Sequence, residues 1–193
     1  MLGRGRQGAY TGGMMTMQPR LIRTARERDD LGWTEMAWSD RLLASLGLAT
    51  LFTEDRLDCA EAPFTLRGLH FQRPPHAQAR LLRVLSGRAM AVLVDLRRGS
   101  GGFGRQGVHL LDAETPAALF VPEGFAVGTM TLLPKTLLLT RFSAPVVPAA
   151  RSGLLWNDPA LGITWPLMGA VPVMEAADRA LPRLAEIDDP FPD

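Results

Sequence analysis

Residues 80–96 read RLLRVLSGRAMAVLVDL, two apolar runs, Arg80–Leu85 and Ala89–Leu96, joined by Ser86-Gly87-Arg88. Short apolar runs on either side of a three-residue connection that contains glycine predict a β-hairpin. Similar runs follow at intervals of about 8–12 residues, with turn-forming residues between them. Such spacing predicts an all-β sandwich or barrel, and we expect a jelly-roll barrel. The further runs are Gly107–Leu111, Ala117–Val121, Gly128–Leu133 and Thr136–Arg141.

Two segments outside these runs have helical patterns. Ser39–Leu46 (SDRLLASL) offers a serine at the N-cap position and is followed by Gly47, a frequent helix stop. Val173–Leu184 combines glutamate and alanine until a proline interrupts it. We therefore expect a single jelly-roll domain over residues 18–193, with short peripheral helices and a C-terminal helical segment. The glycine-rich residues 1–17 predict a flexible tail.

Composition excludes several classes of protein. The chain has 193 residues, a length that suits one domain with a sizeable core. Its 21 basic and 20 acidic residues give a formal net charge of +1, so we expect neither nucleic acid nor an anionic membrane as a partner. No stretch has the roughly 18 consecutive apolar residues of a membrane span, and the first residues lack the apolar run of a signal peptide. These features predict a cytoplasmic protein.

Several chemically useful residue types are scarce. Cys59 is the only cysteine, so no internal disulfide can form, and no Cys/His cluster has the spacing of a zinc site. We expect no metal. Lys135 is the only lysine and Tyr10 the only tyrosine, and an active site must draw on this short supply. The three histidines are His70, His76 and His109.

The segment Leu66–Gln72 (LRGLHFQ) places His70 on a predicted strand close to Arg67. Gly68, between them, allows the backbone to approach a neighbour closely. A single histidine on a strand is compatible with a structural role. Together with Arg80 and the other basic residues that follow, however, it predicts a face suited to an anionic ligand such as a phosphate.

Four strings of sequence resemble one family in order and spacing over about Leu66–Pro166. They are RGLHFQRPPHAQARLLRV (residues 67–84), VDLRRGSGGFGRQGVHL (94–110), LFVPEGFAVG (119–128) and SGLLWNDPALGITWP (152–166). The chain is similar to the dTDP-4-dehydrorhamnose 3,5-epimerases. This resemblance implies a cupin-type jelly roll, a homodimer and an isomerase that needs no cofactor. It also implies a nucleotide-sugar substrate, a dTDP-4-keto-6-deoxyhexose, whose C4 ketone delocalises the carbanion left by proton abstraction.

The resemblance implies roles for particular residues. His70 stands where the family has its catalytic base, and an imidazole pKa near about 6.5 suits proton abstraction at neutral pH. Asp178 stands where the family has the carboxylate that orients the base, and Arg80 where it has the lysine that stabilises the enolate. Arginine keeps that charge but spreads it over a planar group with different reach. We expect Arg67, His76 and Gln72 to bind the substrate.

Two departures from the family bear on chemistry. The family has a tyrosine acid on the strand before WND, and counting back from Trp156 places Thr140 there. Val127 stands where the family usually has a histidine. Loss of the acid predicts reduced epimerisation, or epimerisation at C3 or C5 only. Two alternatives stay open: a member that binds a sugar nucleotide or a partner protein without turnover, and an enzyme for another keto-sugar or a non-sugar ketone.

Overall fold

The computed structural model describes residues 17–48 and 51–191. One set of strands comprises β1 (Arg20–Arg23), β4 (Glu54–Ala60), β6 (Arg80–Ser86), β9 (Ala117–Val121) and β11 (Thr136–Phe142). A second set comprises β5 (Leu66–Gln72), β7 (Arg88–Asp95), β8 (Gln106–Asp112), β10 (Phe125–Thr131) and β12 (Arg151–Gly153). The remaining strands and the α-helices are β2 (Arg26–Asp29), β3 (Gly32–Glu35), α1 (Asp40–Ser45) and α2 (Ala176–Arg179). Short 3-10 turns span Arg98–Ser100, Pro148–Ala150, Pro159–Leu161 and Leu184–Glu186.

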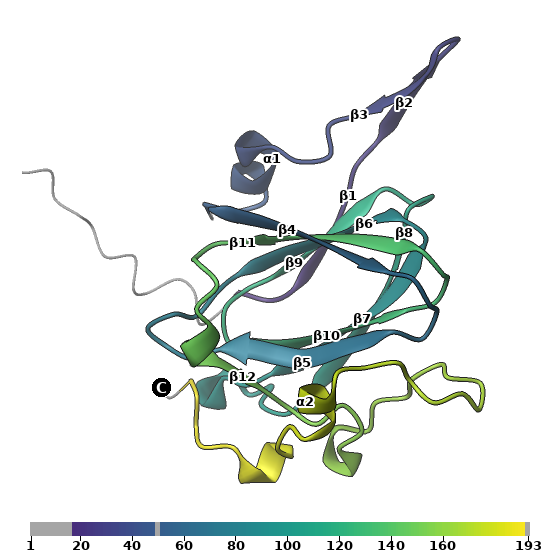
Figure 1. Ribbon diagram of the computed structural model, residues 1–193. Helices are drawn as coiled ribbons and strands as arrows, with labels where there is room; N and C mark the ends of the chain where they lie inside the picture. Colours follow the sequence, from purple (N-terminus) through teal and green to yellow (C-terminus); the bar gives the residue numbers. More distant parts are fainter. Residues whose placement is uncertain (1–16, 49–50, 192–193) are drawn as a thin grey trace, which may run out of the picture.

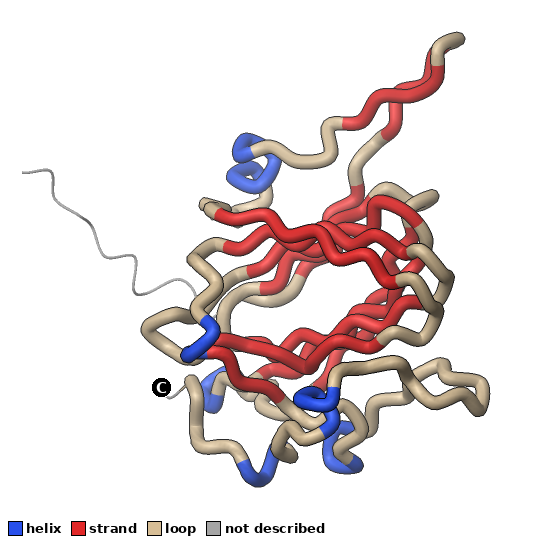
Figure 2. Tube along the Cα trace, in the orientation of Figure 1, coloured by secondary structure: helices blue, strands red, loops and turns tan. Residues whose placement is uncertain are grey.

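Two five-stranded antiparallel sheets face one another, and the helices lie outside them (Figures 1 and 2). The strand orders are β1-β9-β6-β11-β4 and β12-β5-β10-β7-β8. The ribbon formed by β2 and β3 extends away from the first sheet (Figure 1). This arrangement confirms the predicted all-β jelly roll.

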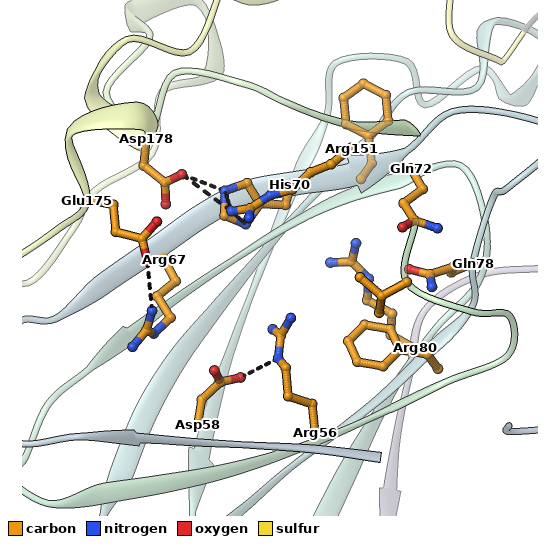
Figure 3. Close-up of a pocket in the computed structure, with 13 residues that line it drawn as sticks. Arg56, Asp58, Arg67, His70, Gln72, Gln78, Arg80, Arg151, Glu175 and Asp178 are labelled. Carbon is orange, nitrogen blue, oxygen red and sulfur yellow. Dashed lines mark hydrogen bonds and ion pairs between the residues drawn. The ribbon is translucent and has the colours of Figure 1, made fainter. Parts of the chain in front are cut away.

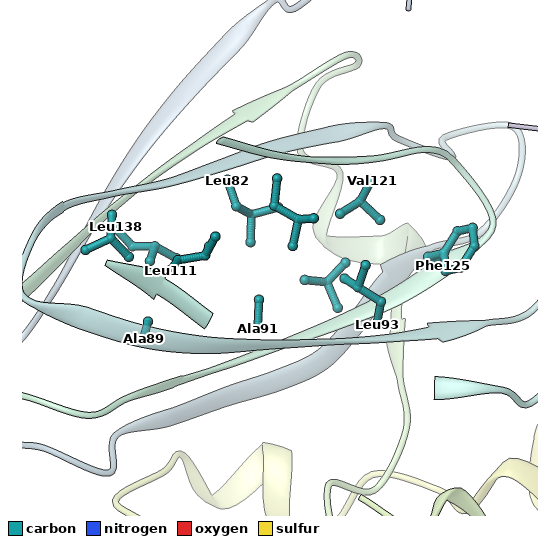
Figure 4. Packing of buried hydrophobic residues seen from close by; sticks show 11 residues of the cluster. Leu82, Ala89, Ala91, Leu93, Leu111, Val121, Phe125 and Leu138 are labelled. Atoms are coloured by element: carbon teal, nitrogen blue, oxygen red, sulfur yellow. The ribbon is translucent and has the colours of Figure 1, made fainter. Parts of the chain in front are cut away.

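Apolar side chains fill the space between the two sheets (Figure 4). Leu82 on β6 and Leu138 on β11 point inward from the first sheet, and Ala91 and Leu93 on β7 point inward from the second. All four are buried. Removing such surface from water contributes about 25 cal/mol per Å² of apolar area, so this layer stabilises the packing of one sheet on the other.

The prediction that residues 80–96 form a β-hairpin is wrong, because the two strands do not pair with each other. β6 pairs with β9 and β11 in the first sheet, whereas β7 pairs with β8 and β10 in the second. The chain therefore crosses from one sheet to the other at Gly87, whose φ of 80° favours glycine. Neither strand lies at the edge of its sheet and the middle of each is buried, and an apolar run alone does not reveal which neighbour it pairs with.

Most other predicted elements are confirmed within a few residues. Ala117–Val121 coincides with β9, and the helix predicted at Ser39–Leu46 is α1, in which the Ser39 side chain caps Leu42 N. The C-terminal helical segment is much shorter than predicted, because only the four residues of α2 are α-helical between Val173 and Leu184. The predicted tail lies outside the described residues except for Met17. No helix in the described part of the chain is long and apolar enough to cross a membrane.

Candidate active site

A pocket of about 190 Å³ lies between the two sheets (Figure 3). It is close to β4, an edge strand of the first sheet, and to β12 and β5, the edge strand of the second sheet and its neighbour. Its lining is unusually rich in charge for a space inside a barrel. The charged residues are Arg56, Asp58, Arg67, Arg80, Arg151, Glu175 and Asp178. The others are His70, Phe71, Gln72, Gln78, Phe142 and Val146.

An irregularity in β5 turns two predicted residues toward this pocket. Along β10, Val127 pairs with His70 and Thr129 with Arg67, so two residues of β5, Gly68 and Leu69, lie opposite one residue of β10. Such a bulge re-aims side chains, and here it brings Arg67 and His70 to the same side of the strand. Gly68 at this point has a φ of 110°, and a Cβ there would lie 2.6 Å from the carbonyl oxygen of Val127. The bulge therefore requires glycine.

His70 and Asp178 are in direct contact. Oδ1 of Asp178, on α2, lies 2.6 Å from Nε2 of His70. The backbone N–H of Gly68 donates to the other carboxylate oxygen at 2.8 Å, so both oxygens of Asp178 have fixed partners. The side chain of Asp178 is only 3% exposed and that of His70 is 17% exposed. The predicted pair is therefore a preorganised unit.

This unit is an ionised carboxylate beside a neutral imidazole. Burial lowers the pKa of His70 below its usual 6.5, Asp178 opposes that effect, and the charges of Arg151 and Arg80 add to it. Burial alone would raise the pKa of Asp178, but the hydrogen bonds from His70 and Gly68 bring it below 3.8. An ionised carboxylate only accepts hydrogen bonds, so Nε2 of His70 carries the proton and Nδ1 keeps a lone pair.

Arg80 reaches the pocket from the start of β6. Burial and the nearby Arg56 and Arg151 lower its pKa to about 10, which leaves it cationic at neutral pH. Its guanidinium lies 5.7 Å from the ring of Phe142. No carboxylate among the described residues forms an ion pair with Arg80, whereas Arg67 pairs with Glu175 and Arg56 with Asp58. Arg80 is thus the cation of the pocket that is most available to an anionic group.

Gln72 and His76, the other predicted binding residues, differ in their position relative to the pocket. Gln72 lines the pocket, but its side-chain amide donates to the carbonyls of His76 and Pro145 and accepts from Val147 N, so it mainly braces two loops. His76 is exposed and its side chain does not line the pocket. Its backbone carbonyl accepts a hydrogen bond from Gln72, and the predicted contact of His76 with ligand stays a prediction.

β11 presents Phe142 to the pocket, not Thr140. Both residues point into the barrel because side chains on a strand alternate, but Thr140 lies one inward position further from the cavity. Thr140, which stands at the predicted position of the acid, is therefore buried inside the barrel and does not line this pocket. Among the residues that the structure describes, the pocket wall contains no phenol, lysine, thiol or side-chain hydroxyl.

Several residues that line the pocket were not predicted from the sequence. Arg56 and Asp58 belong to β4, whose sequence EDRLDCA lacks the apolar alternation of a strand. Arg151 belongs to β12, which has only three residues. Arg56 and Asp58 face His70 across the cavity, whereas Arg151 lies against the His70 ring (Figure 3). Only the two-residue spacing of Arg56 and Asp58 could have indicated that they share one face.

In the part of the chain that the structure describes, no group of three or more His, Cys, Asp and Glu side chains is placed to hold a metal ion. Val127, opposite His70 on the neighbouring strand, offers no ligand atom. The donor set of the pocket is instead four guanidiniums and three carboxylates around one imidazole. This set suits a polar, anionic organic ligand.

Comparisons with known proteins agree with this geometry. A dTDP-4-dehydrorhamnose 3,5-epimerase from Sinorhizobium fredii is 34% identical over 186 residues, 94% of this chain and 93% of its own length. The crystal structure of the Bacillus anthracis dTDP-4-dehydrorhamnose 3,5-epimerase, with TDP and pyrophosphate bound, has a TM-score of 0.83 and 34% identity, covering 86% of this chain and 93% of that one.

A Legionella pneumophila dTDP-6-deoxy-D-glucose-3,5-epimerase in complex with dTDP-4-keto-L-rhamnose has a TM-score of 0.83 and 28% identity, covering 90% of this chain and 93% of that one. The fold shared with these proteins is the cupin-type jelly roll. A family model described as dTDP-4-dehydrorhamnose 3,5-epimerase matches residues 17–186. The chain therefore belongs to the dTDP-4-dehydrorhamnose 3,5-epimerase family of carbohydrate isomerases.

Proposed function

We propose that the protein epimerises a dTDP-4-keto-6-deoxyhexose by abstracting a proton from a carbon next to the C4 ketone. The observation that carries this proposal is the contact between His70 and Asp178 inside a pocket of matching charge. The complexes of relatives with TDP and with dTDP-4-keto-L-rhamnose support the nucleotide-sugar class of ligand. The membership of this chain in the family supports turnover, and it does not support the alternative of binding alone.

In this proposal His70 is the base. The carbon–hydrogen electron pair moves into the enolate, and the proton moves to Nδ1, the ring nitrogen that keeps a lone pair. Asp178 holds the ring in orientation and stabilises the imidazolium that forms. A positioned acid–base group of this kind contributes about 10²–10⁴-fold to a rate.

Arg80 is the proposed partner of the enolate oxygen. A fixed cation aimed at a developing oxyanion stabilises the transition state more than the ground state, because the full charge develops only during the reaction. Its lack of a carboxylate partner among the described residues leaves its donors available to substrate. We assign Arg67, which lies at the rim beside Glu175, to the diphosphate.

The group that returns a proton to the enolate decides whether one carbon or both are inverted. Inversion requires a proton from the face opposite His70, where Arg56 and Asp58 lie across the pocket. Phe142 lies on that side too, because β11 belongs to the sheet opposite β5 and the Arg56 guanidinium is over the Phe142 ring. Since the described wall offers no phenol there, we propose that water supplies this proton and that inversion is reduced or limited to one carbon. Either C3 or C5 fits this proposal.

The proposal includes a homodimer in the cytoplasm. The extended β2-β3 ribbon carries Trp33, which is 50% exposed, and the outer face of the first sheet exposes Leu57 and Leu85. Exposed apolar surface of this kind supports association with a second copy. The single cysteine, Cys59, makes the fold independent of disulfides, which suits a reducing compartment. Light scattering after size exclusion measures the subunit number, and a monomer would contradict the dimer.

The reaction is tested by incubating the protein with dTDP-4-keto-6-deoxyglucose in D₂O and following the C3 and C5 protons by NMR. The proposal predicts deuterium at one of these carbons or both. Binding of dTDP measured by calorimetry, without exchange at either carbon, would contradict it. Exchange confined to a different keto-sugar would support the alternative of an altered substrate.

A further inference from the structure

Arg151 lies directly against the catalytic pair. Its Nη2 is 2.7 Å from Nε2 and 3.2 Å from Nδ1 of His70, so the guanidinium contacts the ring at both nitrogens. The same atom is 3.7 Å from Oδ1 of Asp178. The Arg151 side chain is 50% exposed, so it has open space into which it can move. β12 holds the residue in place because Arg151 pairs with Gln72 of β5, two positions along the strand from His70.

This contact disfavours the imidazolium form of His70. Nη2 of Arg151 lies nearer to Nε2, which donates to Asp178, than to Nδ1, so the guanidinium lies against the ring and not along the lone pair of Nδ1. A guanidinium donates hydrogen bonds and cannot accept them, so its effect on the ring at this distance is that of a nearby positive charge. An imidazolium so close to it is repelled as a like charge.

The other charged groups around the His70 ring carry equal numbers of positive and negative charges, so the positive charge of Arg151 is not offset. On the side of β5 and α2 these groups are Arg67, Glu175 and Asp178, and across the pocket they are Arg56, Asp58 and Arg80. Asp178 favours the imidazolium, and Arg67 and Arg56 are each engaged by a carboxylate. Of the four arginines, Arg151 alone forms hydrogen-bond contacts with the ring in the described structure.

We propose that Arg151 is a positioning residue that holds His70 in its neutral, proton-accepting form and moves away from the ring when Nδ1 takes the substrate proton. This role deepens the proposed function and rests on it. The carbon–hydrogen proton moves to Nδ1, the electron pair stays on the enolate, and the guanidinium turns into the open half of the pocket.

The direct test is an NMR titration of the histidine rings in the wild-type protein, Arg151→Gln and Arg151→Lys. His70 should titrate at higher pH in Arg151→Gln than in the wild type, because a repelling charge is gone. Arg151→Lys keeps a charge that only donates, so His70 should shift less. His109, on β8, is the internal standard and its titration should not change between the three proteins. A His70 titration unchanged in Arg151→Gln, or moved equally in both variants, would overturn the proposal.

The pH profile of deuterium exchange adds a second readout. Its acid limb should move to higher pH in Arg151→Gln, in step with the NMR titration, whereas a purely structural role would lower the rate without moving the limb. The ring titration needs no substrate. A wild-type protein that exchanges no deuterium would therefore contradict the proposed reaction, while the NMR result would still decide the role of Arg151.

Discussion

Asp178 and His70 are 108 positions apart in sequence, yet Oδ1 of the first lies 2.6 Å from Nε2 of the second. Two local features produce this contact. The bulge in β5 turns His70 into the pocket, and the Gly68 N–H at that bulge binds the second carboxylate oxygen. Because one carboxylate joins the bulge and the base, Asp178 fixes both the position of the ring and its tautomer.

Replacing Asp178 with asparagine should reduce deuterium exchange by about 10²-fold. An amide can keep the bond from Gly68 N, but its NH₂ group cannot accept from Nε2–H, so the ring loses its orientation. The pKa of His70 should also fall further, because the charge that raises it is gone. Glu175→Gln is the matched control, since Glu175 contacts Arg67 and not His70. Equal losses in the two variants would contradict the assigned role of Asp178.

Replacing Arg80 with methionine should lower exchange by about 10²-fold, the usual effect of removing one donor to an oxyanion. The melting temperature should hold or rise, because a buried cation without an ion-pair partner among the described residues costs desolvation free energy. Arg80→Lys, which keeps the charge, should retain more activity than Arg80→Met. A clear drop in melting temperature with activity intact would show that Arg80 is structural.

Phe142→Tyr should add a proton donor to the face opposite His70. We expect exchange to become faster or to extend to the second carbon, measured by NMR in D₂O. Thr140→Val alters the same strand and the same inward face outside the pocket, so it should leave the exchange pattern unchanged. If Phe142→Tyr matches the wild type at both carbons, the missing phenol does not limit inversion.

Stability should fall as the pH drops below about 6.5. The pKa of His70 is lowered in the folded protein, so the unfolded chain takes up a proton first as pH falls, and the free energy of unfolding declines through that window. His70→Asn should flatten this decline in thermal melts. Part of the slope should remain, because the pKa of His109 is also lowered by burial. Parallel melting curves for both proteins would refute the assignment to His70.

The fold was largely predictable where apolar runs are strong. β9 matched its predicted bounds because both ends are marked by turn residues and its interior is buried. β2 (RERD) and β4 (EDRLDCA) were missed because their sequences are mostly charged, and pairing with a neighbour makes them strands. The hairpin at Gly87 was mispredicted because burial on both sides hides which sheet a strand joins.

The site was less predictable from the residues alone. His70 and Asp178 were identified through the family resemblance, since no periodicity links two positions so far apart. Spacing placed Thr140 on β11 but could not show that Phe142, and not Thr140, lines the pocket, because where the pocket ends along β11 depends on the packing of the folded chain. The role of Arg151 depends on the pairing of a three-residue strand, which only the folded chain reveals.

The most direct test of the account compares deuterium incorporation from D₂O into dTDP-4-keto-6-deoxyglucose by the wild-type protein and by His70→Asn, with dTDP binding measured on both. The account predicts deuterium at C3 or C5 with the wild type, a loss of at least about 10²-fold with His70→Asn, and similar binding by the two proteins. Undiminished exchange by His70→Asn would contradict the central claim that His70 is the base.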